Sequence, residues 1–291
     1  MPKPKLALVS NYKNSAIDII MESMLSYFEQ EFDVTTFHTN DPLPEDNFEK
    51  FDLAHFGWLL SVPPEVIPPT TANIWSLSVF QDPKNPCSIG GYAQQLTHTR
   101  PDRIIVDDIS TLQLLGQLGW TKTTMIPLAF NTDLKLLPYP EEFTIGYFGN
   151  NYPSKRFEVI EAAAGLAEVP LVGYKFDPNR TVYAVDPEQI YESMSVYVHA
   201  SFQDTNSMPV MEALKCGRPV ISTRNYGLER VLNDGWNGYW FDGSAEDLVK
   251  KIQEVRKREI MMRDEAKNTI LPSLYDSAMQ YLEVFHEVLD S

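Results

Sequence analysis

The sequence has few cysteines and no long apolar segment, and each shortage excludes a class of protein. Its 291 residues include two cysteines, Cys87 and Cys216, which allow at most one disulfide and lack the spacing of metal ligands. No run reaches the roughly 18–20 apolar residues of a membrane span, and the apolar run near the N-terminus is too short for a signal peptide. We therefore expect a soluble protein of the cytoplasm, or of the host cytoplasm if the protein is viral.

The sequence also has few basic residues relative to acidic ones. There are 24 Lys and Arg residues against 40 Asp and Glu residues, which gives a formal net charge of −16. The excess acid is spread evenly, with 9 basic against 16 acidic residues in 1–140 and 15 against 24 in 141–291. General electrostatic binding to nucleic acid or anionic lipid needs a basic face, so this composition excludes it, although it leaves room for a local basic pocket.

Short apolar runs alternate with amphipathic helical patterns in the first half of the chain. The expected strands cover residues 5–10, 34–37, 53–56, 74–79, 104–106 and 124–127. The expected helices cover residues 14–30 and 110–118. The expected cap of the second helix is Ser110 or the acidic pair Asp107 and Asp108. Alternation of this kind indicates parallel β-α-β units and hence a doubly wound α/β sheet.

A proline-rich and acidic break at residues 137–142 precedes a second half with the same pattern. Here the expected strands cover 143–148, 170–174, 196–201 and 219–223, and the expected helices cover 154–166, 187–194, 208–215, 245–259 and 273–289. We predict two Rossmann-like domains, 1–138 and 139–271, followed by a helical segment at 272–291. Two such sheets that face each other place their strand ends around a central cleft, where ligands of α/β sheets bind.

Residues 200–223 carry the most chemical information. They read as a strand end, a polar loop, a short helix capped by Asn206 or Ser207, and a second strand. Because free N–H groups point outward at a helix N-terminus, this loop is suited to bind an anion. Glu212 lies about one turn into the helix, eight positions after Asp204. A carboxylate just past a phosphate site can accept hydrogen bonds from ribose hydroxyls.

This segment resembles the signature of the retaining GT-B glycosyltransferases, the glycosyl transferases group 1 family. The signature has two acids separated by seven residues, then Ala, then Gly-x-Pro-Val-Ile; here the acids are Asp204 and Glu212, and GRPVI follows. Three further segments resemble the family and follow in the family's order. They are an interdomain segment at residues 126–133, a phosphate motif at residues 149–162 and a turn at residues 227–238. The resemblance covers roughly residues 100–260. It implies a GT-B fold, with the C-terminal helix crossing back to the first domain.

The resemblance also implies roles for the matching residues. Glu212 would hold the ribose of the nucleotide, Asp204 would contact a sugar hydroxyl, and Lys155 would neutralise the diphosphate. Backbone N–H groups of the turn before the helix would bind the sugar and the diphosphate; they belong to Asn206, Ser207 and Met208. Asp204 departs from the family pattern, because it is one methylene shorter than the glutamate found there.

The phosphate motif departs from the pattern at two positions. It begins at Gly149, but Asn150 stands where the family has an arginine, and Arg156 stands where the family has a glycine after the lysine. Arg156 could supply the missing guanidinium, a group that binds phosphate through two parallel hydrogen bonds.

Two histidines lie on predicted strands. His55 ends a strand of the first domain, at an edge expected to face the cleft. Because family members carry a histidine near such a position, close to the sugar, His55 is a candidate catalytic residue, with a structural histidine as the alternative. His199 lies inside a predicted buried strand and is interpreted as structural.

The function implied by the resemblance is retaining transfer of a hexose, with UDP-glucose as the expected donor, to an acceptor hydroxyl. The sequence lacks the Asp-x-Asp motif that holds a metal in the other main glycosyltransferase fold, so we expect neither a metal nor another cofactor. The acceptor stays open between a small molecule, a glycan, a protein and a modified nucleobase of phage DNA. The second alternative is an inactive protein that retains a nucleotide or sugar site. The oligomeric state is not predicted.

Overall fold

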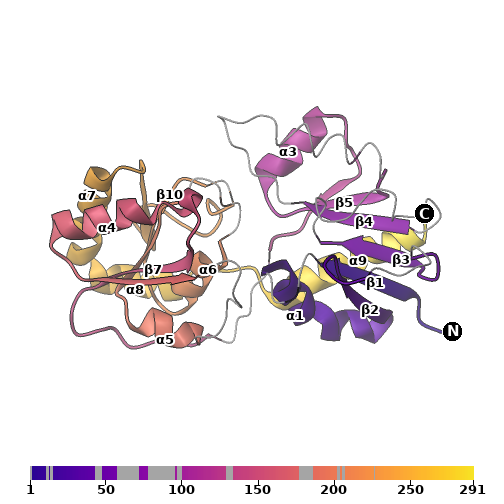
Figure 1. Cartoon of the computed structure of the whole chain (residues 1–291), viewed down its shortest axis with the longest axis horizontal. Helices are drawn as coiled ribbons and strands as arrows, with labels where there is room; N and C mark the ends of the chain where they lie inside the picture. Colours follow the sequence, from indigo (N-terminus) through magenta and orange to yellow (C-terminus); the bar gives the residue numbers. More distant parts are fainter. Residues whose placement is uncertain are drawn as a thin grey trace. The chain divides into compact units, whose positions relative to one another are not determined.

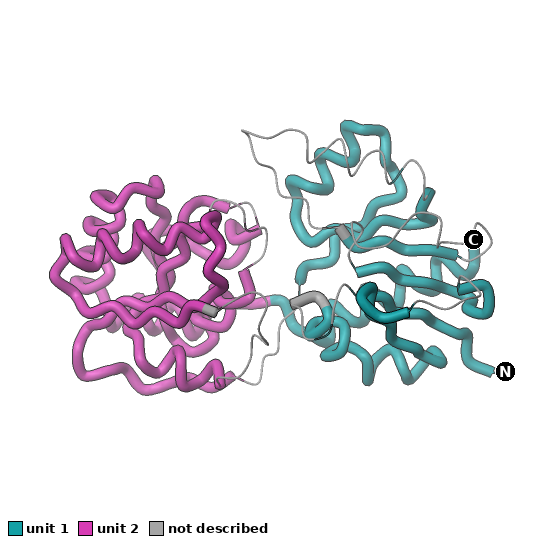
Figure 2. The backbone as a smooth tube through the Cα atoms, in the orientation of Figure 1, with its two compact units in different colours: residues 1–131, 272–291 teal, residues 132–271 magenta. Residues whose placement is uncertain are grey.

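A computed structural model of the chain describes the following residues: 2–10, 13, 16–42, 48–57, 72–77, 96, 100–128, 134–176, 186–201, 204, 207–225 and 227–291. The chain forms two compact units, which Figure 2 shows in different colours. Unit 1 consists of residues 1–131 and 272–291, and unit 2 consists of residues 132–271. The division therefore falls between residues 131 and 132, whereas the sequence predicted it after Pro138.

Unit 1 is built on a parallel sheet of six strands in the order β2-β1-β3-β4-β5-β6 (Figure 1). The strands are β1 (Lys5–Ser10), β2 (Asp33–His38), β3 (Leu53–Phe56), β4 (Ala72–Leu77), β5 (Arg103–Val106) and β6 (Thr123–Met125). The helices described here are α1 (Ala16–Glu31), α3 (Ile109–Gln117) and α9 (Leu274–Leu289). Runs of apolar residues without alternation, such as Leu6–Val9, fit strands that are covered on both faces.

The helix at the far end of the chain completes unit 1. The ring of Phe285 on α9 lies 5.3 Å from that of Phe28 on α1, and the two helices pack side by side. The hydroxyl of Ser277 donates a hydrogen bond to the carbonyl oxygen of Pro127 at 2.9 Å. Helix α9 therefore covers a face that the earlier elements of the unit leave open.

The cap of α3 is one of the two that the sequence predicted. Asp108 occupies the N-cap, and its carboxylate accepts hydrogen bonds from the backbone N–H groups of Ser110 at 2.8 Å and Thr111 at 2.9 Å. Ser110 is thus the second helical residue. The acidic pair was therefore the correct candidate and Ser110 the wrong one, because a carboxylate can reach two amide groups at once, which a hydroxyl at Ser110 could not do from inside the helix.

Unit 2 is built on a parallel sheet of five strands in the order β11-β10-β9-β7-β8. The strands are β7 (Ile145–Asn150), β8 (Leu171–Phe176), β9 (Val196–His199), β10 (Val220–Thr223) and β11 (Gly238–Phe241). The helices are α4 (Phe157–Ala167), α5 (Pro187–Glu192), α6 (Met208–Lys215), α7 (Ala245–Lys257) and α8 (Glu259–Lys267), and a short 3-10 helix spans Pro153–Lys155. Neither β11 nor α8 was predicted.

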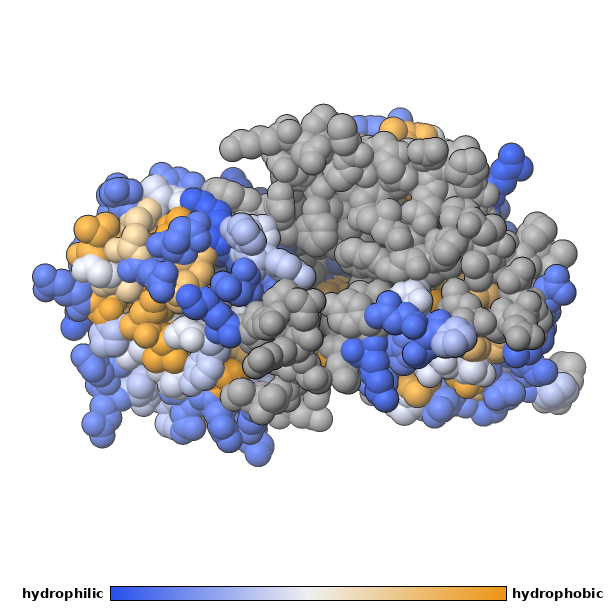
Figure 3. All heavy atoms as spheres, in the orientation of Figure 1, coloured by the Kyte–Doolittle hydropathy of each residue, from blue (hydrophilic) through white to orange (hydrophobic). Residues whose placement is uncertain are grey.

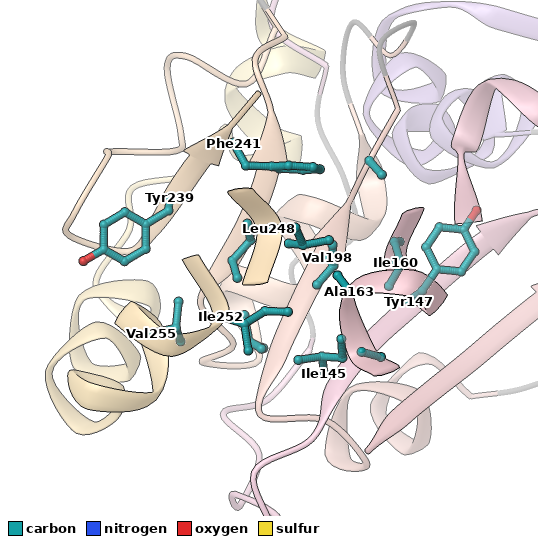
Figure 4. Packing of buried hydrophobic residues seen from close by; sticks show 14 of the residues in the cluster. Ile145, Tyr147, Ile160, Ala163, Val198, Tyr239, Phe241, Leu248, Ile252 and Val255 are labelled. Carbon is teal, nitrogen blue, oxygen red and sulfur yellow. The ribbon is translucent and has the colours of Figure 1, made fainter. Parts of the chain in front are cut away.

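Two apolar cores cover the two faces of this sheet. One packs α4 and α7 on the strands through residues such as Ile160 and Leu248, and Figure 4 shows it from close by. The other packs α5 and α6 on the opposite face through residues such as Tyr191 and Leu214. Helices on both faces of a parallel sheet are what a doubly wound α/β fold requires, so the predicted fold class is confirmed.

Two arginines hold the segment that enters unit 2. Arg218 is 0 % exposed, and it donates hydrogen bonds to the carbonyl oxygens of Tyr191 at 2.8 Å and of Pro138. Arg263 donates to the carbonyl oxygen of Leu137 at 3.0 Å. Both guanidinium groups also lie 4.8 Å from the centroid of the Tyr139 ring. These contacts explain why the residues before Tyr139 belong to unit 2.

The surface of unit 2 is mixed in character. Figure 3 shows apolar side chains between hydrophilic ones on the visible face of this unit. Among the described residues, no helix combines the length and apolar character that crossing a membrane would require. Cys216 is buried and forms no disulfide within the described part of the chain, and Cys87 lies outside it.

Candidate functional site

The order of the strands in unit 2 marks one position on the sheet edge. In chain order, β7 is the first strand of the sheet and β9 the third, and the two are neighbours. Helix α4, which follows β7, packs in one core, whereas α6, which follows β9, packs in the other. The connections after the two strands therefore diverge to opposite faces. Such a switch point, at the carboxyl ends of the strands, is where open α/β sheets bind ligands.

Lys155 and Asp204 meet at this switch point. Lys155 ends the 3-10 helix after β7, Asp204 lies in the loop after β9, and the Lys155 ammonium forms an ion pair with Oδ2 of Asp204. The two side chains are 20 % and 17 % exposed. Burial alone would raise the pKa of Asp204, but Lys155 and then His199 outweigh burial and hold that pKa well below its ordinary value. Asp204 is therefore ionised, and it neutralises the cation predicted to bind a diphosphate.

His199 is the third member of this cluster, and the sequence interpretation did not include it. Its Nε2 atom lies 3.3 Å from Oδ2 of Asp204, and its side chain is 3 % exposed. The ring stacks on that of Tyr197, with centroids 6.4 Å apart. As the last residue of β9, His199 is placed by the strand directly before the loop that carries Asp204. Within the described ranges, no group of three or more His, Cys, Asp or Glu side chains could hold a metal ion.

The end of β7 lies next to this cluster. Figure 4 shows Tyr147 at the margin of the core, with its hydroxyl directed away from the other side chains. That hydroxyl donates a hydrogen bond to the carbonyl oxygen of Asn150 at 2.8 Å. Burial and then the charge of Asp204 raise the pKa of Tyr147, so the phenol stays protonated. Oδ1 of Asn150 has no hydrogen-bond partner among the described residues.

Gly149 leaves the space that the Tyr147 hydroxyl occupies. A Cβ atom at Gly149 would lie 2.6 Å from this hydroxyl. We expect Gly149→Ala to lower the free energy of unfolding by about 1–3 kcal/mol, because the ring must move and its hydrogen bond is lost. Urea unfolding measures this change.

Gly165→Ala is the matched control, since no atom lies within 4 Å of a Cβ at that position in α4. This control is expected to be neutral or to stabilise the protein by up to about 1 kcal/mol. Equal effects of the two substitutions would contradict the role given to Gly149.

Arg156 follows the lysine in a left-handed conformation. Its φ and ψ angles are 52° and 43°, in the region that glycine adopts without steric cost. This explains why a glycine suits the corresponding position of the family pattern. The Arg156 guanidinium donates a hydrogen bond through Nη2 to the carbonyl oxygen of Gly243 at 2.8 Å, in the loop after β11. In this structure it therefore links two loops of the same sheet edge.

The N-terminus of α6 also opens at this edge. Ser207 is at the N-cap and Met208 is the first helical residue; both are buried, and the Ser207 side chain forms no capping hydrogen bond. Pro209 follows in the first turn, where its missing N–H is tolerated. Asn206, also predicted as a site residue, lies outside the described residues.

Glu212 is 6 % exposed and has a partner that the sequence did not reveal. Its Oε2 atom accepts a hydrogen bond of 2.7 Å from the hydroxyl of Tyr191 on α5. Burial raises the pKa of Glu212 to about 7, although the Tyr191 hydrogen bond acts in the opposite direction. Tyr191 is twenty-one positions earlier in an otherwise ordinary amphipathic helix, so nothing in the sequence pattern singles it out.

This pKa makes the stability of the protein depend on pH. Because the pKa of Glu212 is about 7 in the folded state against an ordinary value of 4.5, the folded state binds the proton more tightly than the unfolded chain does. The stabilisation that protonated Glu212 gives the folded state is complete below pH 4.5 and is lost as the pH rises to about 7. We expect the free energy of unfolding to fall by about 1 kcal/mol per pH unit in this window, relative to Glu212→Gln. Urea unfolding of both proteins at pH 5, 6 and 7 tests this; parallel curves would contradict it.

His55 lies in unit 1 and is enclosed there. It is 0 % exposed, its Nε2 atom lies 2.8 Å from Oγ of Ser76, and its ring lies 5.4 Å from that of Tyr281 and 5.5 Å from that of Phe285 on α9. Burial lowers the pKa of His55 to about 3, so the ring is neutral. These contacts support the structural alternative over a catalytic role, because a ring with no exposed surface cannot touch a substrate.

Comparison with known sequences identifies a family over part of the chain. The family "Glycosyl transferases group 1" matches residues 180–270, a range that includes Asp204, Glu212 and α6. A D-inositol 3-phosphate glycosyltransferase from Paenarthrobacter aurescens (strain TC1) is 35 % identical over 105 residues, which is 34 % of this chain. That match covers 24 % of the relative, so the chain spans about a quarter of its length.

Comparison with solved structures covers nearly the full chain. Anabaena HepE in complex with UDP and glucose has a TM-score of 0.73 at 14 % identity, covering 97 % of this chain and 99 % of that one. Sucrose-phosphate synthase from Thermosynechococcus elongatus has a TM-score of 0.76 at 15 % identity, covering 99 % of this chain and 100 % of that one. Residues 180–270 therefore match the glycosyl transferases group 1 family, and the chain as a whole has the fold of the GT-B glycosyltransferases.

Proposed function

We propose that the protein is a retaining glycosyltransferase that moves glucose from UDP-glucose to an acceptor hydroxyl in the cytoplasm, with neither a metal nor another cofactor. The observation that carries the proposal is the meeting of Lys155, Asp204 and the N-terminus of α6 at the switch point of unit 2. The binding of UDP-glucose by a protein of similar fold, Anabaena HepE, supports the choice of donor.

The proposed chemistry follows from the charge that develops on the donor. When the bond between glucose and the diphosphate breaks, the leaving UDP gains negative charge. Lys155 and the outward N–H groups of Ser207 and Met208 would stabilise that charge, and each such contact is worth about 2.7–4 kcal/mol. Glu212 would accept hydrogen bonds from the ribose, and Asp204 would turn from Lys155 to a glucose hydroxyl. In this account Gly149, Asn150 and Arg156 shape the loop beside the diphosphate.

The acceptor is the open part of the proposal. We assign unit 1 to the acceptor side. The acceptor hydroxyl could belong to a small molecule, a glycan, a protein or a modified nucleobase of phage DNA. The acidic composition of residues 1–140 argues against a polyanionic acceptor bound by charge alone.

An inactive protein that binds a nucleotide sugar is the second candidate function. One observation favours it: Asp204 is a shorter acid than the family pattern has, and here it is paired with Lys155 rather than open to a ligand. Donor binding alone therefore cannot decide between the two candidates, whereas donor consumption can.

The test has two steps. Thermal unfolding with UDP, UDP-glucose and GDP-mannose should show a rise in Tm with the uridine compounds, since a ligand at 100 times its Kd stabilises the folded state by about 2.7 kcal/mol. Glu212→Gln should reduce that rise, whereas the exposed control Glu246→Gln on α7 should keep it. Then ³¹P NMR should detect slow conversion of UDP-glucose to UDP, unchanged by EDTA.

Each failure has a distinct meaning. A rise in Tm without conversion of UDP-glucose, across a panel of acceptors, would establish the inactive alternative. No rise in Tm with any uridine compound would overturn the donor assignment, and an equal rise in Glu212→Gln would overturn the role given to this carboxylate.

A further inference from the structure

His199 has no use in the proposed chemistry, although it is built into the site. The ring is buried, and its Nε2 atom makes no well-aligned hydrogen bond among the described residues. Oδ2 of Asp204, the same oxygen that pairs with Lys155, lies 3.3 Å from this atom. A buried polar atom without a hydrogen bond costs stability, so its position next to a shared carboxylate oxygen calls for an explanation.

Binding of a diphosphate changes the charge balance of this cluster. In the present structure Lys155 neutralises Asp204. If Lys155 turns to a diphosphate, Asp204 remains as a carboxylate that is 17 % exposed and has lost its cation. A buried charge left without a partner is strongly unfavourable, so either another cation must replace Lys155 or Asp204 must take up a proton.

We infer that His199 is a positioning residue that takes up a proton from solvent when Lys155 leaves Asp204 for the diphosphate of the donor, and that the resulting imidazolium holds Asp204 ionised and in place for the sugar. This inference rests on the proposed function for the identity of the diphosphate. In this exchange the ion pair between Lys155 and Asp204 breaks, His199 takes up one proton from the buffer, and an ion pair between His199 and Asp204 forms.

Among the described residues around His199, the groups named below do not compete for this role. Tyr197 stacks on the ring from the same strand, and burial raises its pKa well above the ordinary value, so it stays neutral. Ser222 lies opposite on β10 and carries no charge. From β7, Tyr147 stays protonated for the same reason as Tyr197. The charge of Glu212 on α6 raises the pKa of Tyr197 further.

The first experiment needs no donor. Lys155→Met removes the ammonium from Asp204 in the free protein, as diphosphate binding would. NMR of protein labelled with ¹³C at histidine Cε1 follows the ring of His199, with the signal assigned through His199→Gln. We expect the midpoint of the His199 titration to move at least one pH unit upward in Lys155→Met and to stay in place in Lys250→Met, an exposed lysine on α7. An unmoved midpoint in Lys155→Met would show that His199 does not respond to the loss of the ammonium, and it would overturn the inference.

The second experiment uses UDP-glucose, whose phosphates do not titrate near pH 7. Calorimetric titrations at pH 7.5 in two buffers of different ionisation enthalpy give the number of protons taken up on binding. We expect wild type to take up more protons than His199→Gln, by up to one per UDP-glucose; any contribution of Glu212 is common to both. Equal uptake would overturn the inference. If UDP-glucose does not bind at all, the proposed function fails, and the first experiment still decides whether His199 replaces Lys155.

Discussion

Lys155→Met is expected to slow the consumption of UDP-glucose by about 10²–10³-fold. The ammonium at this position is the one side-chain cation that pairs with Asp204 at the described switch point, and the proposed leaving group is an anion. Removal of one preorganised donor to a developing negative charge costs about this factor in other enzymes. The rate measured by ³¹P NMR at saturating UDP-glucose gives the effect on kcat.

The matched control is Lys250→Met, in which the same change is made to a side chain that is 72 % exposed on α7. It should consume UDP-glucose at the wild-type rate. Lys155→Arg should recover part of the activity, because it keeps the charge but changes its geometry. Wild-type activity in Lys155→Met would remove this residue from the site and leave the ion pair with Asp204 as a structural feature.

Arg218→Met is expected to cause the largest loss of stability, about 3–5 kcal/mol. The substitution removes a fully buried guanidinium and leaves the carbonyl oxygens of Tyr191 and Pro138 without their donor. Each unsatisfied buried carbonyl costs about 1–3 kcal/mol, and the contact with the Tyr139 ring is lost as well. In a unit of this size the Tm should fall by roughly 6–20 °C, which calorimetry measures directly.

The control for this substitution is Arg224→Met, because the Arg224 side chain is 71 % exposed. Its Tm should change by a small fraction of the Arg218→Met effect, since an exposed pair contributes about 0–1 kcal/mol. A loss below 1 kcal/mol in Arg218→Met would show that the two carbonyl groups find other partners and that the segment at Pro138 is held by other contacts.

The predicted fold was accurate where the hydrophobic pattern extends over whole elements. β1, at Lys5–Ser10, and α6, at Met208–Lys215, have the predicted bounds. The first is a short continuous apolar run, typical of a buried strand, and the apolar residues of the second recur at helical spacing. β11, at Gly238–Phe241, was missed because its four residues follow a turn and are too few to show a pattern. Helix α8 was missed because the break at Arg258 interrupts a continuous run of helix-forming residues.

The candidate site was predictable as a set of residues but not as a set of contacts. Lys155 and Asp204 were both singled out, yet each was assigned a ligand, and their pairing follows only from the adjacency of β7 and β9. His199 meets Asp204 for a different reason, because it is the last residue of β9 and Asp204 lies in the loop that follows this strand. The link between Glu212 and Tyr191 depends on how α5 packs against α6, which no local pattern encodes. The contacts that support the structural alternative for His55 depend on α9, more than 200 positions away.

The crystal structure of the protein with UDP-glucose tests the central claim most directly. The account predicts the diphosphate at the switch point between β7 and β9, within hydrogen-bond distance of the Lys155 ammonium and the backbone N–H of Met208. It also predicts the ribose at Glu212 and a closer contact between His199 and Asp204 than the present 3.3 Å. A nucleotide bound elsewhere, or a diphosphate at this edge with Lys155 still paired to Asp204, would contradict it.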